Sequence, residues 1–568
     1  MVNATPKTGN DNMQQGVSRG LALSRVLHFE SLMRRRLGEA RAQRYVRLQN
    51  YYLGQQLPPE NVDQPLMINH FARICDKHNG YLWGEYKKHV VDFRVNIINK
   101  DAFDEGQQME GDRIARQIKA LIERVIYTEN NGDVTLDQAS LNGSIYGDSV
   151  LEVNYNNEKR RVVIESVLPE YFHCMWKISN MQDLTEAVVA YPIDRLVALD
   201  EYGTNGNDQF LGYQMVNPDF TPGIGILWKR WSPVAFQVWV DDVNVINQPN
   251  PYIQEDPQGN LYPGMIPFIH IPNLQAGSEY FGYGDAECCV QLFDELNRRM
   301  ADFGDIINSH AHPIITLKDF TGEAEDLPVG PDSIWDLGKN GEANRMDGTG
   351  PGPEAMGYLE KVKSEIQETG SMPAIAYGGH SGGGGGSHVS GVALAMAMMP
   401  VVERSRKKRL RWKAGLRRLA EMVLYIINVN DPALLQSYGF TYEQTLLFQI
   451  EPIFADILPK DELQMINENV ALTTNMLRST ELALEKQGCD DIPAEIEKIK
   501  ADMQFKAALA VPTPPAEGGT AGKNSDQGKG GSNQLPGGLG SQAGKPGVLI
   551  TSPTLDKVDN VSMANALG

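Results

Sequence analysis

The sequence predicts an α+β protein in which long helices surround one β-rich stretch, and three patterns carry this prediction. Between residues 23 and 140, and again after residue 281, apolar side chains recur at steps of three and four, the spacing of amphipathic helices. Between residues 145 and 275, apolar and polar residues alternate with period two around Asn-rich turns, which is typical of strands and hairpins. The third pattern is a short turn-rich segment, residues 313–351, that separates two helical stretches.

Composition and charge narrow the class of protein. The chain has 568 residues, of which 41% are hydrophobic and 22% charged, so it is long enough for more than one domain of ordinary globular composition. The formal net charge of -20 argues against a simple nucleic-acid binder with a basic surface. The 5 cysteines show no C-x-x-C spacing, which makes a disulfide framework or a zinc site improbable. We expect a soluble, intracellular protein, because no signal peptide and no apolar run of ~20 residues is found. We also expect no cofactor and no metal.

The first half of the chain reads as helices followed by strands. Residues 1–22 resemble a disordered arm, and residues 23–280 then form one large region. Its first part contains helical segments, among them "LSRVLHFESLMRRRLGEARAQRYVRLQNYYLG", which has a basic face. From "LNGSIYGDSVLEVNYNNEKRRVVIESVLPEYFHCMW" onward the pattern changes to alternation, and residues 145–275 are therefore predicted to be mainly β.

Two long helices are predicted on either side of a small mixed segment. Residues 281–312 place Phe293, Leu296 and Met300 on one apolar face, and Pro313 ends this helix. Residues 313–351 contain strand fragments and turns. Residues 352–377 return as a second amphipathic helix, with Leu359 and Val362 on its apolar face. The expected arrangement is a pair of rods that carries a small knob.

A glycine-rich stretch, "YGGHSGGGGGSHVSG", follows the second rod. It lacks the lysine of a Walker-type phosphate loop, and it fits neither the spacing nor the strand context of a dinucleotide-binding loop. Five glycines together oppose helix formation by roughly 2.5–5 kcal/mol, enough to interrupt a helix. Residues 378–391 are therefore either a linker without a further function or a mobile loop that protrudes from a rigid part of the protein. Composition alone does not distinguish these two interpretations.

The remainder of the chain is again helical. Residues 392–454 predict a very long helix, bent at Pro400 where a backbone hydrogen bond is lost, and then a strand. Residues 455–510 predict further helices with an acidic surplus. Residues 511–568 are rich in Gly, Pro, Ser and Asn, a composition typical of a disordered tail.

The order of these segments resembles the portal (connector) proteins of tailed double-stranded DNA bacteriophages. The resemblance runs through most of the chain and rests on several short segments taken together. "RYVRLQNYYLG" is similar to the family's N-terminal Arg-Tyr element and Tyr-Tyr-x-Gly turn, and "GSIYGDSVLEVNY" to the opening of its wing sheet. "MIPFIHIPN" with "FGYGDAECCVQLFDELNRRMAD" resembles its strand and stem helix, "SGVAL" the start of the helix after its tunnel loop, and "PKDELQMINENVALTTNMLRSTELAL" its crown helices.

The resemblance implies a homododecameric ring at one capsid vertex, through which double-stranded DNA is packaged and later ejected. By analogy, residues 281–312 and 352–377 would be the stem, 313–351 the clip, 23–280 with 392–454 the wing, and 455–510 the crown. Implied partners are major capsid and scaffolding proteins, the large terminase ATPase, head-tail adaptor proteins and the DNA itself, but no membrane. Candidates for the channel-lining tunnel loop are Gly379, His380, Ser381, Gly382, Gly383, Gly384, Gly385, Gly386, Ser387, His388 and Ser390. Candidates for terminase or adaptor docking on the clip are Asp326, Asp332, Trp335 and Asp336.

A run of basic residues in the long helix after the glycine stretch is the strongest charge signal in the sequence. Two interpretations stay open: a helix face that meets solvent or a neighbouring subunit, and a face that contacts DNA phosphates. The residues concerned are Arg404, Arg406, Lys407, Lys408, Arg409, Arg411, Lys413, Arg417 and Arg418.

Two other functional classes remain as alternatives. One is a different oligomeric head-completion or capsid structural protein. The other is a nucleotide-binding enzyme that uses the glycine loop. No nucleophile–base pair is apparent in the sequence, so we predict that the protein is not an enzyme.

Overall fold

The computed structural model describes residues 41–56, 67–86, 88–98, 104–177, 180–202, 223–241, 243–255, 261–277, 279–311, 314–319, 340–346, 352–378, 391–458, 462–487 and 492–509. The two segments predicted to be disordered, residues 1–22 and 511–568, lie outside these ranges. The chain divides into two compact units, residues 1–467 and residues 468–568, which are described separately below. The described part contains both helices and sheets, which confirms the α+β class.

One long helix, α11 (Met399–Asn430), is central to the first unit. Residues along its length, including Trp412, Leu416 and Leu419, are fully buried, and α11 packs against helix α3, strand β14 and the sheet that contains β2 and β11. The ring of Trp412 meets that of Trp83 at a centroid distance of 5.0 Å in an edge-on arrangement. The helices around it are α2 (Arg41–Tyr52), α3 (His70–Trp83), α4 (Glu105–Glu123), the π-helical turn η2 (Arg124–Glu129), α5 (Gly132–Tyr146), α12 (Pro432–Ser437) and α13 (Tyr442–Thr445).

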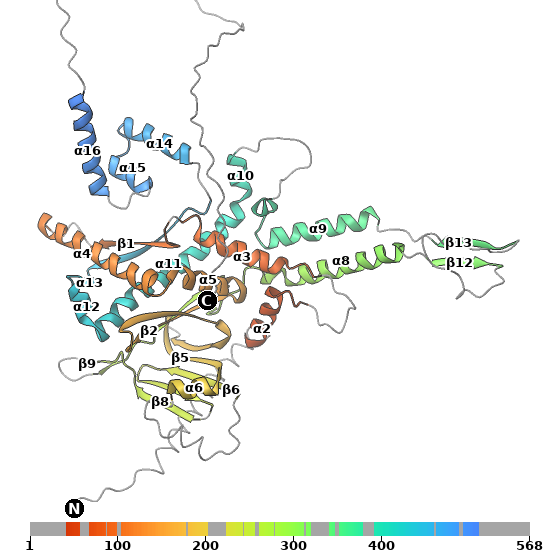
Figure 1. The fold of residues 1–568 in the computed structure, drawn as a ribbon, viewed down its shortest axis with the longest axis horizontal. Helices are drawn as coiled ribbons and strands as arrows, with labels where there is room; N and C mark the ends of the chain where they lie inside the picture. Colours follow the sequence, from red (N-terminus) through yellow and green to blue (C-terminus); the bar gives the residue numbers. More distant parts are fainter. Residues whose placement is uncertain are drawn as a thin grey trace, which may run out of the picture. The chain divides into compact units, whose positions relative to one another are not determined.

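The β-rich part of the first unit contains two antiparallel sheets (Figure 1). A three-stranded sheet has the order β11-β2-β3, and a five-stranded sheet has the order β4-β5-β6-β7-β8. The strands are β2 (Asp148–Asn156), β3 (Arg161–Val167), β4 (Phe172–Lys177), β5 (Asn180–Asp194), β6 (Ile224–Trp231), β7 (Ala235–Val240), β8 (Val243–Pro249) and β11 (Phe268–Pro272). Smaller elements in this region are η3 (Pro169–Tyr171), helix α6 (Arg195–Tyr202) and the hairpin of β9 (Gln254–Glu255) with β10 (Leu261–Tyr262).

A strand pair of long sequence separation completes this core. Strand β1 (Val91–Ile97) pairs antiparallel with β14 (Phe448–Phe454), so that Val91 lies opposite Phe454. Strand β14 in turn packs against α11. A strand within residues 392–454 was predicted from the sequence, but its partner β1, which lies among helices in the sequence, was not.

The two rods predicted around the knob are α8 (Val290–Ala311) and α9 (Pro353–Thr369), which run side by side (Figure 1). Each is shorter than predicted. Residues 281–286 form no helix, and the short turn η4 (Glu287–Cys289) precedes α8. Helix α9 ends at Thr369, before a separate turn, η6 (Ala374–Tyr377). In the sequence between α8 and α9, strand β12 (Ile314–Lys318) pairs antiparallel with β13 (Glu342–Met346).

A second apolar cluster fixes the base of this helical pair. Phe293 and Leu296 of α8 pack with Val362 and Ile366 of α9, and this cluster includes residues of α2, α3 and the start of α11. Farther along the pair, Ile307 and Met356 are exposed. The apolar faces predicted from the sequence are therefore buried within the chain only at the base.

The helix after the glycine stretch is interrupted rather than gently bent. Helix α10 (Gly391–Ala397) ends at Ala397, and α11 begins at Met399 with Pro400 in its first turn. Proline is well tolerated at that position because the first amides of a helix have no intrahelical acceptor. Pro400 thus lies at a helix start, close to the predicted bend.

The start of the first strand was predicted too early in the sequence. The segment "LNGSIY" belongs to the last turns of α5, and β2 begins only at Asp148. Gly147 ends α5 with a φ of 96°, a left-handed conformation that glycine adopts without strain.

The second unit, from residue 468 onward, contains only helices among its described residues. They are the last part of α14 (Glu462–Thr474), followed by α15 (Thr480–Gln487) and α16 (Ile492–Leu509). Arg478 donates to the Asn469 side chain between α14 and α15. Within the described residues of either unit, no helix is both long and apolar enough to cross a bilayer.

Candidate functional site

Two groups of predicted site residues cannot be placed. The tunnel-loop candidates between Gly379 and Ser390 lie outside the described residues, as do the clip candidates Asp326, Asp332, Trp335 and Asp336. The structure describes the elements that flank each group. The tunnel-loop candidates lie in the sequence between η6 and α10, and the clip candidates lie between β12 and β13. The roles assigned to these residues therefore stay predictions.

The basic run is described in full, and its members point in different directions from α11. Lys408 and Arg404 are buried within the chain. Arg409, Lys413 and Arg417, at steps of four, reach the β14 region: Arg409 donates to the carbonyl of Ala455 at 2.6 Å, Lys413 pairs with Glu451, and Arg417 donates to the carbonyl of Ile450 at 3.2 Å. A function inside one subunit was not among the two interpretations weighed from the sequence.

The remaining members of the basic run differ in exposure. Arg406 and Lys407 are exposed, while Arg411 and Arg418 are half-buried. The predicted contact with phosphate or with a neighbouring subunit stays a prediction for this subset. For Arg404 and Lys408, the described contacts are internal.

The innermost contact of this region joins α11 to the segment that leads into α8. The Lys408 ammonium lies 2.7 Å from Asp285 Oδ2, and both side chains are completely buried. Lys408 Nζ also donates to the Ser144 hydroxyl at 3.1 Å. Burial of a charge is costly unless it is paired and hydrogen-bonded, and this pair meets both conditions.

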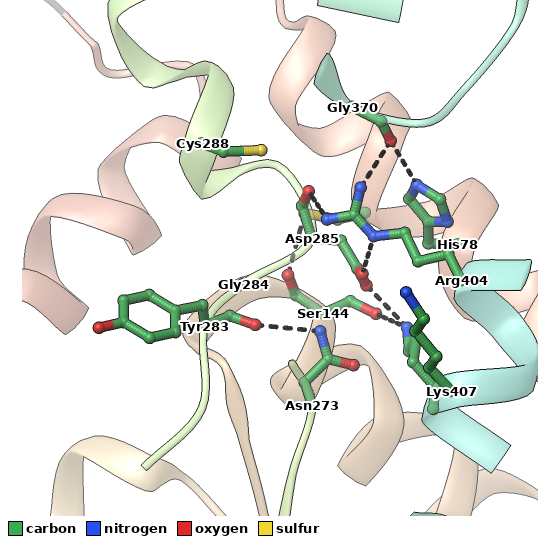
Figure 2. Close-up of polar contacts among 12 residues, drawn as sticks. His78, Ser144, Asn273, Tyr283, Gly284, Asp285, Cys288, Gly370, Arg404 and Lys407 are labelled. Carbon is green, nitrogen blue, oxygen red and sulfur yellow. Dashed lines mark hydrogen bonds and ion pairs between the residues drawn. The ribbon is translucent and has the colours of Figure 1, made fainter. Parts of the chain in front are cut away.

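Arg404, one turn before Lys408, connects the same carboxylate to the end of α9 (Figure 2). Its guanidinium donates to the carbonyl of Gly370 at 2.8 Å and to the backbone carbonyl of Asp285 at 2.6 Å, and its Nε lies 3.2 Å from Asp285 Oδ1. His78 of α3 also faces the Gly370 carbonyl, with Nε2 at 2.8 Å. Elements α3, α9, α11 and the segment before α8 therefore meet at one group of polar atoms.

The charges in this group shift the pKa values of its members. Burial alone would raise the pKa of Asp285, but the positive charge of Lys408, with that of Arg404, outweighs burial and holds the pKa well below its usual range. Burial lowers the pKa of His78 to about 4; Asp285 opposes this shift, whereas Arg404 and Lys408 add to it. His78 is therefore neutral near pH 7, with the proton on Nε2, because a carbonyl oxygen can only accept.

A second buried network lies beside the first and involves the start of the described chain. Arg44 of α2 donates from Nε and Nη2 to the two carboxylate oxygens of Glu287 at 2.7 and 2.8 Å. The same guanidinium donates to the carbonyls of Gly282 at 2.8 Å and Tyr146 at 3.3 Å. The side chain of Arg44 is only 5% exposed, so one buried arginine joins α2, the end of α5 and η4.

Asp148, the first residue of β2, is the acceptor at the centre of the second network. The Tyr45 hydroxyl donates to Asp148 Oδ2, and the backbone amide of Gly282 donates to Oδ1 at 2.9 Å. His270 Nε2 of β11 lies 2.8 Å from the same oxygen. Burial would raise the pKa of Asp148, but the hydrogen bond and charge of His270, together with the charge of Arg44, lower it.

Two glycines allow the backbones of the two networks to touch. A Cβ on Gly147 would lie 2.4 Å from the carbonyl oxygen of Gly282, and a Cβ on Gly282 would lie 2.2 Å from the carbonyl oxygen of Gly147. Real Cβ atoms do not approach other atoms so closely. The contact therefore requires glycine at both positions, which lie far apart in the sequence.

These networks bring together the short segments that carry the family resemblance. "RYVRLQNYYLG" supplies Arg44 and Tyr45, and "GSIYGDSVLEVNY" supplies Ser144 and Asp148. "FGYGDAECCVQLFDELNRRMAD" supplies Asp285 and Glu287. Segments that are separate in the sequence thus form one buried polar junction, which we call the junction: His78, Arg44, Tyr45, Ser144, Asp148, His270, Asp285, Glu287, Gly370, Arg404 and Lys408.

The acidic members of the junction were not among the residues predicted from the sequence, although a signal was present. The tripeptide Tyr-Gly-Asp occurs at 146–148 and again at 283–285, and both aspartates are fully buried. His78 carries no such signal, because a single histidine in an amphipathic helix has no distinguishing pattern.

The chemistry of the junction is structural. Its charged groups are paired with one another or with backbone atoms, and no described residues group three or more His, Cys, Asp or Glu side chains in a way that could hold a metal ion. Such an arrangement can hold the base of the α8–α9 pair in a fixed orientation against α11 and the three-stranded sheet.

Comparison with known proteins gives one family. A family model described as "Phage portal protein, SPP1 Gp6-like" matches residues 38–506. A search of curated proteins finds no match.

Proposed function

This chain belongs to the SPP1 Gp6-like family of phage portal proteins, and from that premise we propose that twelve copies form a ring around a channel for double-stranded DNA. Proteins of this family are structural components of the virion, and they assemble as oligomers with other capsid components. In the proposal, the ring occupies one vertex of the capsid, is assembled in the host cytoplasm, and lets the genome enter during packaging and leave during ejection. The observation that carries it is the family match over residues 38–506.

The charge of the chain supports a channel through which DNA slides. Binding to DNA gains affinity from each lysine or arginine that neutralises a phosphate, and twelve basic linings would hold the duplex. The net charge is -20, and cations of the basic run such as Arg404, Lys408 and Lys413 are engaged with acceptors of their own chain. This internal pairing leaves fewer cations to hold a moving polyanion.

We assign the channel constriction to residues 379–390, as the family resemblance implies. The support is their position in the chain: they connect η6, which follows α9, to α10, which precedes α11. Glycine and serine would offer small, uncharged contacts to the DNA backbone. Replacing Gly382–Gly386 with a helix-forming segment is expected to slow or block packaging while rings still assemble; normal packaging by this variant would refute the assignment.

We assign α8 and α9 to the stem, and the segment around β12 and β13 to the clip. The wing then comprises the region up to residue 280 with α10, α11 and β14, and the crown comprises residues 455–510. In this assignment the large terminase docks on the clip through residues near Asp326, Asp332, Trp335 and Asp336, and head-tail adaptors later take its place. Scaffolding and major capsid proteins would contact the outside of the ring.

Negative-stain electron microscopy of the purified protein tests the proposal directly. Rings with a central hole are expected, and symmetry analysis of top views gives the number of subunits. Particles without a hole would instead favour another head-completion or capsid protein. Nucleotide binding through the glycine loop is a separate alternative, and a thermal-shift assay with ATP tests it; we expect no shift.

A further inference from the structure

A groove lies between the outer side of α11 and strand β11. Its volume is about 560 Å³. One wall includes residues 268–272 of β11 together with Tyr280, and the other includes Lys407, Leu410, Arg411 and Arg418 of α11. Among the described strands, β11 pairs only with β2, so the groove runs along a sheet edge. Such edges present backbone donors and acceptors that another chain segment can use.

The groove combines an apolar floor with positive charge. The strand side contributes Phe268 and Ile271, and Leu410 projects from α11 with 72% of its surface exposed. Lys407 and Arg411 form no ion pair with any carboxylate among the described residues. Arg411 donates to the backbone carbonyls of Asn273 and Lys407, both at 3.4 Å. Unpaired cations beside an exposed leucine favour a ligand that is both acidic and apolar.

We propose that this groove receives a segment of a second copy of the chain, with a carboxylate placed between Lys407 and Arg411 and an apolar side chain packed against Leu410. The inference rests on the proposed ring and specifies one of its subunit contacts. A second copy is the favoured occupant because the chain carries a net charge of -20, so its surface has carboxylates in excess. DNA is the weaker candidate because phosphates would gain nothing from the apolar wall or from Leu410.

The contact can be mapped by placing a photoreactive benzoylphenylalanine at Leu410. This position is exposed in a single chain, so the replacement leaves folding intact. Rings are assembled from an equal mixture of ¹⁴N- and ¹⁵N-labelled subunits, irradiated, digested and analysed by mass spectrometry. We expect crosslinks that join light to heavy peptides and that fall on an acidic segment. Crosslinks only between peptides of one isotope would mean that the chain's own residues fill the groove, and would overturn the inference.

Substitutions test whether the groove contributes to assembly. Lys407→Glu and Leu410→Asp should each raise the protein concentration needed for half-maximal ring formation by about tenfold or more, because a buried leucine and a paired charge are each lost. Arg406→Glu is the matched control: Arg406 is also exposed on α11 but does not line the groove. Analytical ultracentrifugation gives the assembly curves, and thermal unfolding of each variant verifies its folding.

The outcomes separate this inference from the proposed function. If the wild-type chain forms no rings, the proposed function fails. If the wild-type chain forms rings and the groove variants assemble equally well, or the Arg406→Glu control loses as much as Lys407→Glu, only the groove inference fails. If the groove variants assemble normally but bind duplex DNA at least tenfold more weakly with a reduced salt dependence, the groove contacts DNA and the inference is likewise overturned.

Discussion

The Lys408 ammonium and the Asp285 carboxylate form an ion pair of 2.7 Å in which neither side chain is exposed. Lys408 belongs to the basic run of α11, whereas Asp285 precedes α8 by a few residues, so the pair joins the central helix to the base of the helical pair. The pair is held by three further groups: the Ser144 hydroxyl on Lys408, and the side chains of Arg404 and His78 around Asp285 and Gly370. Two cations of the basic run, Lys408 and Arg404, therefore have their carboxylate partner within the same chain.

Breaking this pair from one side should be strongly destabilising. Lys408→Met leaves the Asp285 charge buried with only Arg404 beside it, and loss of one partner of a buried pair costs about 3–5 kcal/mol. The unfolding midpoint in urea measures the loss. Lys407→Met is the control, because Lys407 is adjacent but exposed, and its effect should stay within about 0.5 kcal/mol.

A second substitution distinguishes charge from packing. Adding Asp285→Asn to Lys408→Met removes the uncompensated charge, so we expect the double variant to regain part of the lost stability. A double variant less stable than Lys408→Met would show that the pair is not the source of the effect.

The contact between Gly147 and Gly282 predicts a second stability effect. Gly147→Ala places a Cβ 2.4 Å from the Gly282 carbonyl oxygen and also forces alanine into a left-handed conformation with φ of 96°. We expect a loss of at least about 2 kcal/mol, measured as a decrease in the urea midpoint. Gly357→Ala in α9 is the control: no atom lies within 4 Å of its Cβ position, so this variant should gain roughly 0.5–1 kcal/mol. Equal effects of the two substitutions would contradict the close approach.

The fold could be predicted from the sequence wherever one periodic pattern determined one element. Helices α8, α9 and α11 have apolar faces that are visible in the sequence, and the alternation between residues 145 and 275 corresponds to the two large sheets. The pairing of β1 with β14 could not be predicted, because it joins residues more than 350 positions apart and no local pattern encodes a partner. The start of β2 was misplaced because "LNGSIY" suits a buried helix end and a strand equally well.

The junction could be predicted only in part. The short segments that form it were noted one by one, but the pattern gave no reason to place them in contact. The basic run was interpreted as a surface feature because lysine and arginine are almost never fully buried unless paired. Its partner, Asp285, lies 123 residues before Lys408, and the Tyr-Gly-Asp tripeptide that contains Asp285 does not indicate which cation it pairs with. Long-range ion pairs depend on tertiary structure and are not apparent from local composition.

Arg44 should not be replaceable by lysine. Its guanidinium makes two hydrogen bonds to Glu287 and two more to backbone carbonyls, whereas an ammonium has three donors and no planar fork. We expect Arg44→Lys to cost at least about 1.5 kcal/mol, measured as a lower thermal unfolding midpoint. Arg47→Lys, an exposed position on the same helix, is the control and should have little effect. Similar midpoints for the two variants would argue that the fork geometry of Arg44 is unimportant.

The neutral state of His78 predicts how stability depends on pH. Burial lowers the pKa of His78 to about 4, below the ~6.5 of an unfolded chain, so between these values the unfolded state binds more protons than the folded state. The contribution of neutral His78 to the free energy of unfolding is therefore complete above pH ~6.5. It is lost as the pH falls toward 4, by up to about 3 kcal/mol. A physical reason is visible in the contacts: Nδ1 is buried without a hydrogen-bond partner among the described groups, so a proton added there would be a buried, unpaired charge.

The contribution of His78 to the slope of stability against pH can be isolated with one conservative variant. His78→Gln keeps an amide donor for the Gly370 carbonyl but does not titrate, so its thermal unfolding midpoint should fall less steeply than that of the wild type between pH 6.5 and 4.5. The comparison uses the slopes rather than the absolute midpoints, because the substitution itself can change packing. The Asp285 carboxylate does not titrate in this pH range, because its lowered pKa moves its contribution to the pH dependence of stability to more acidic pH. If wild type and variant lose stability in parallel across this range, then another group accounts for the acid sensitivity and the assignment of a neutral, buried His78 is wrong.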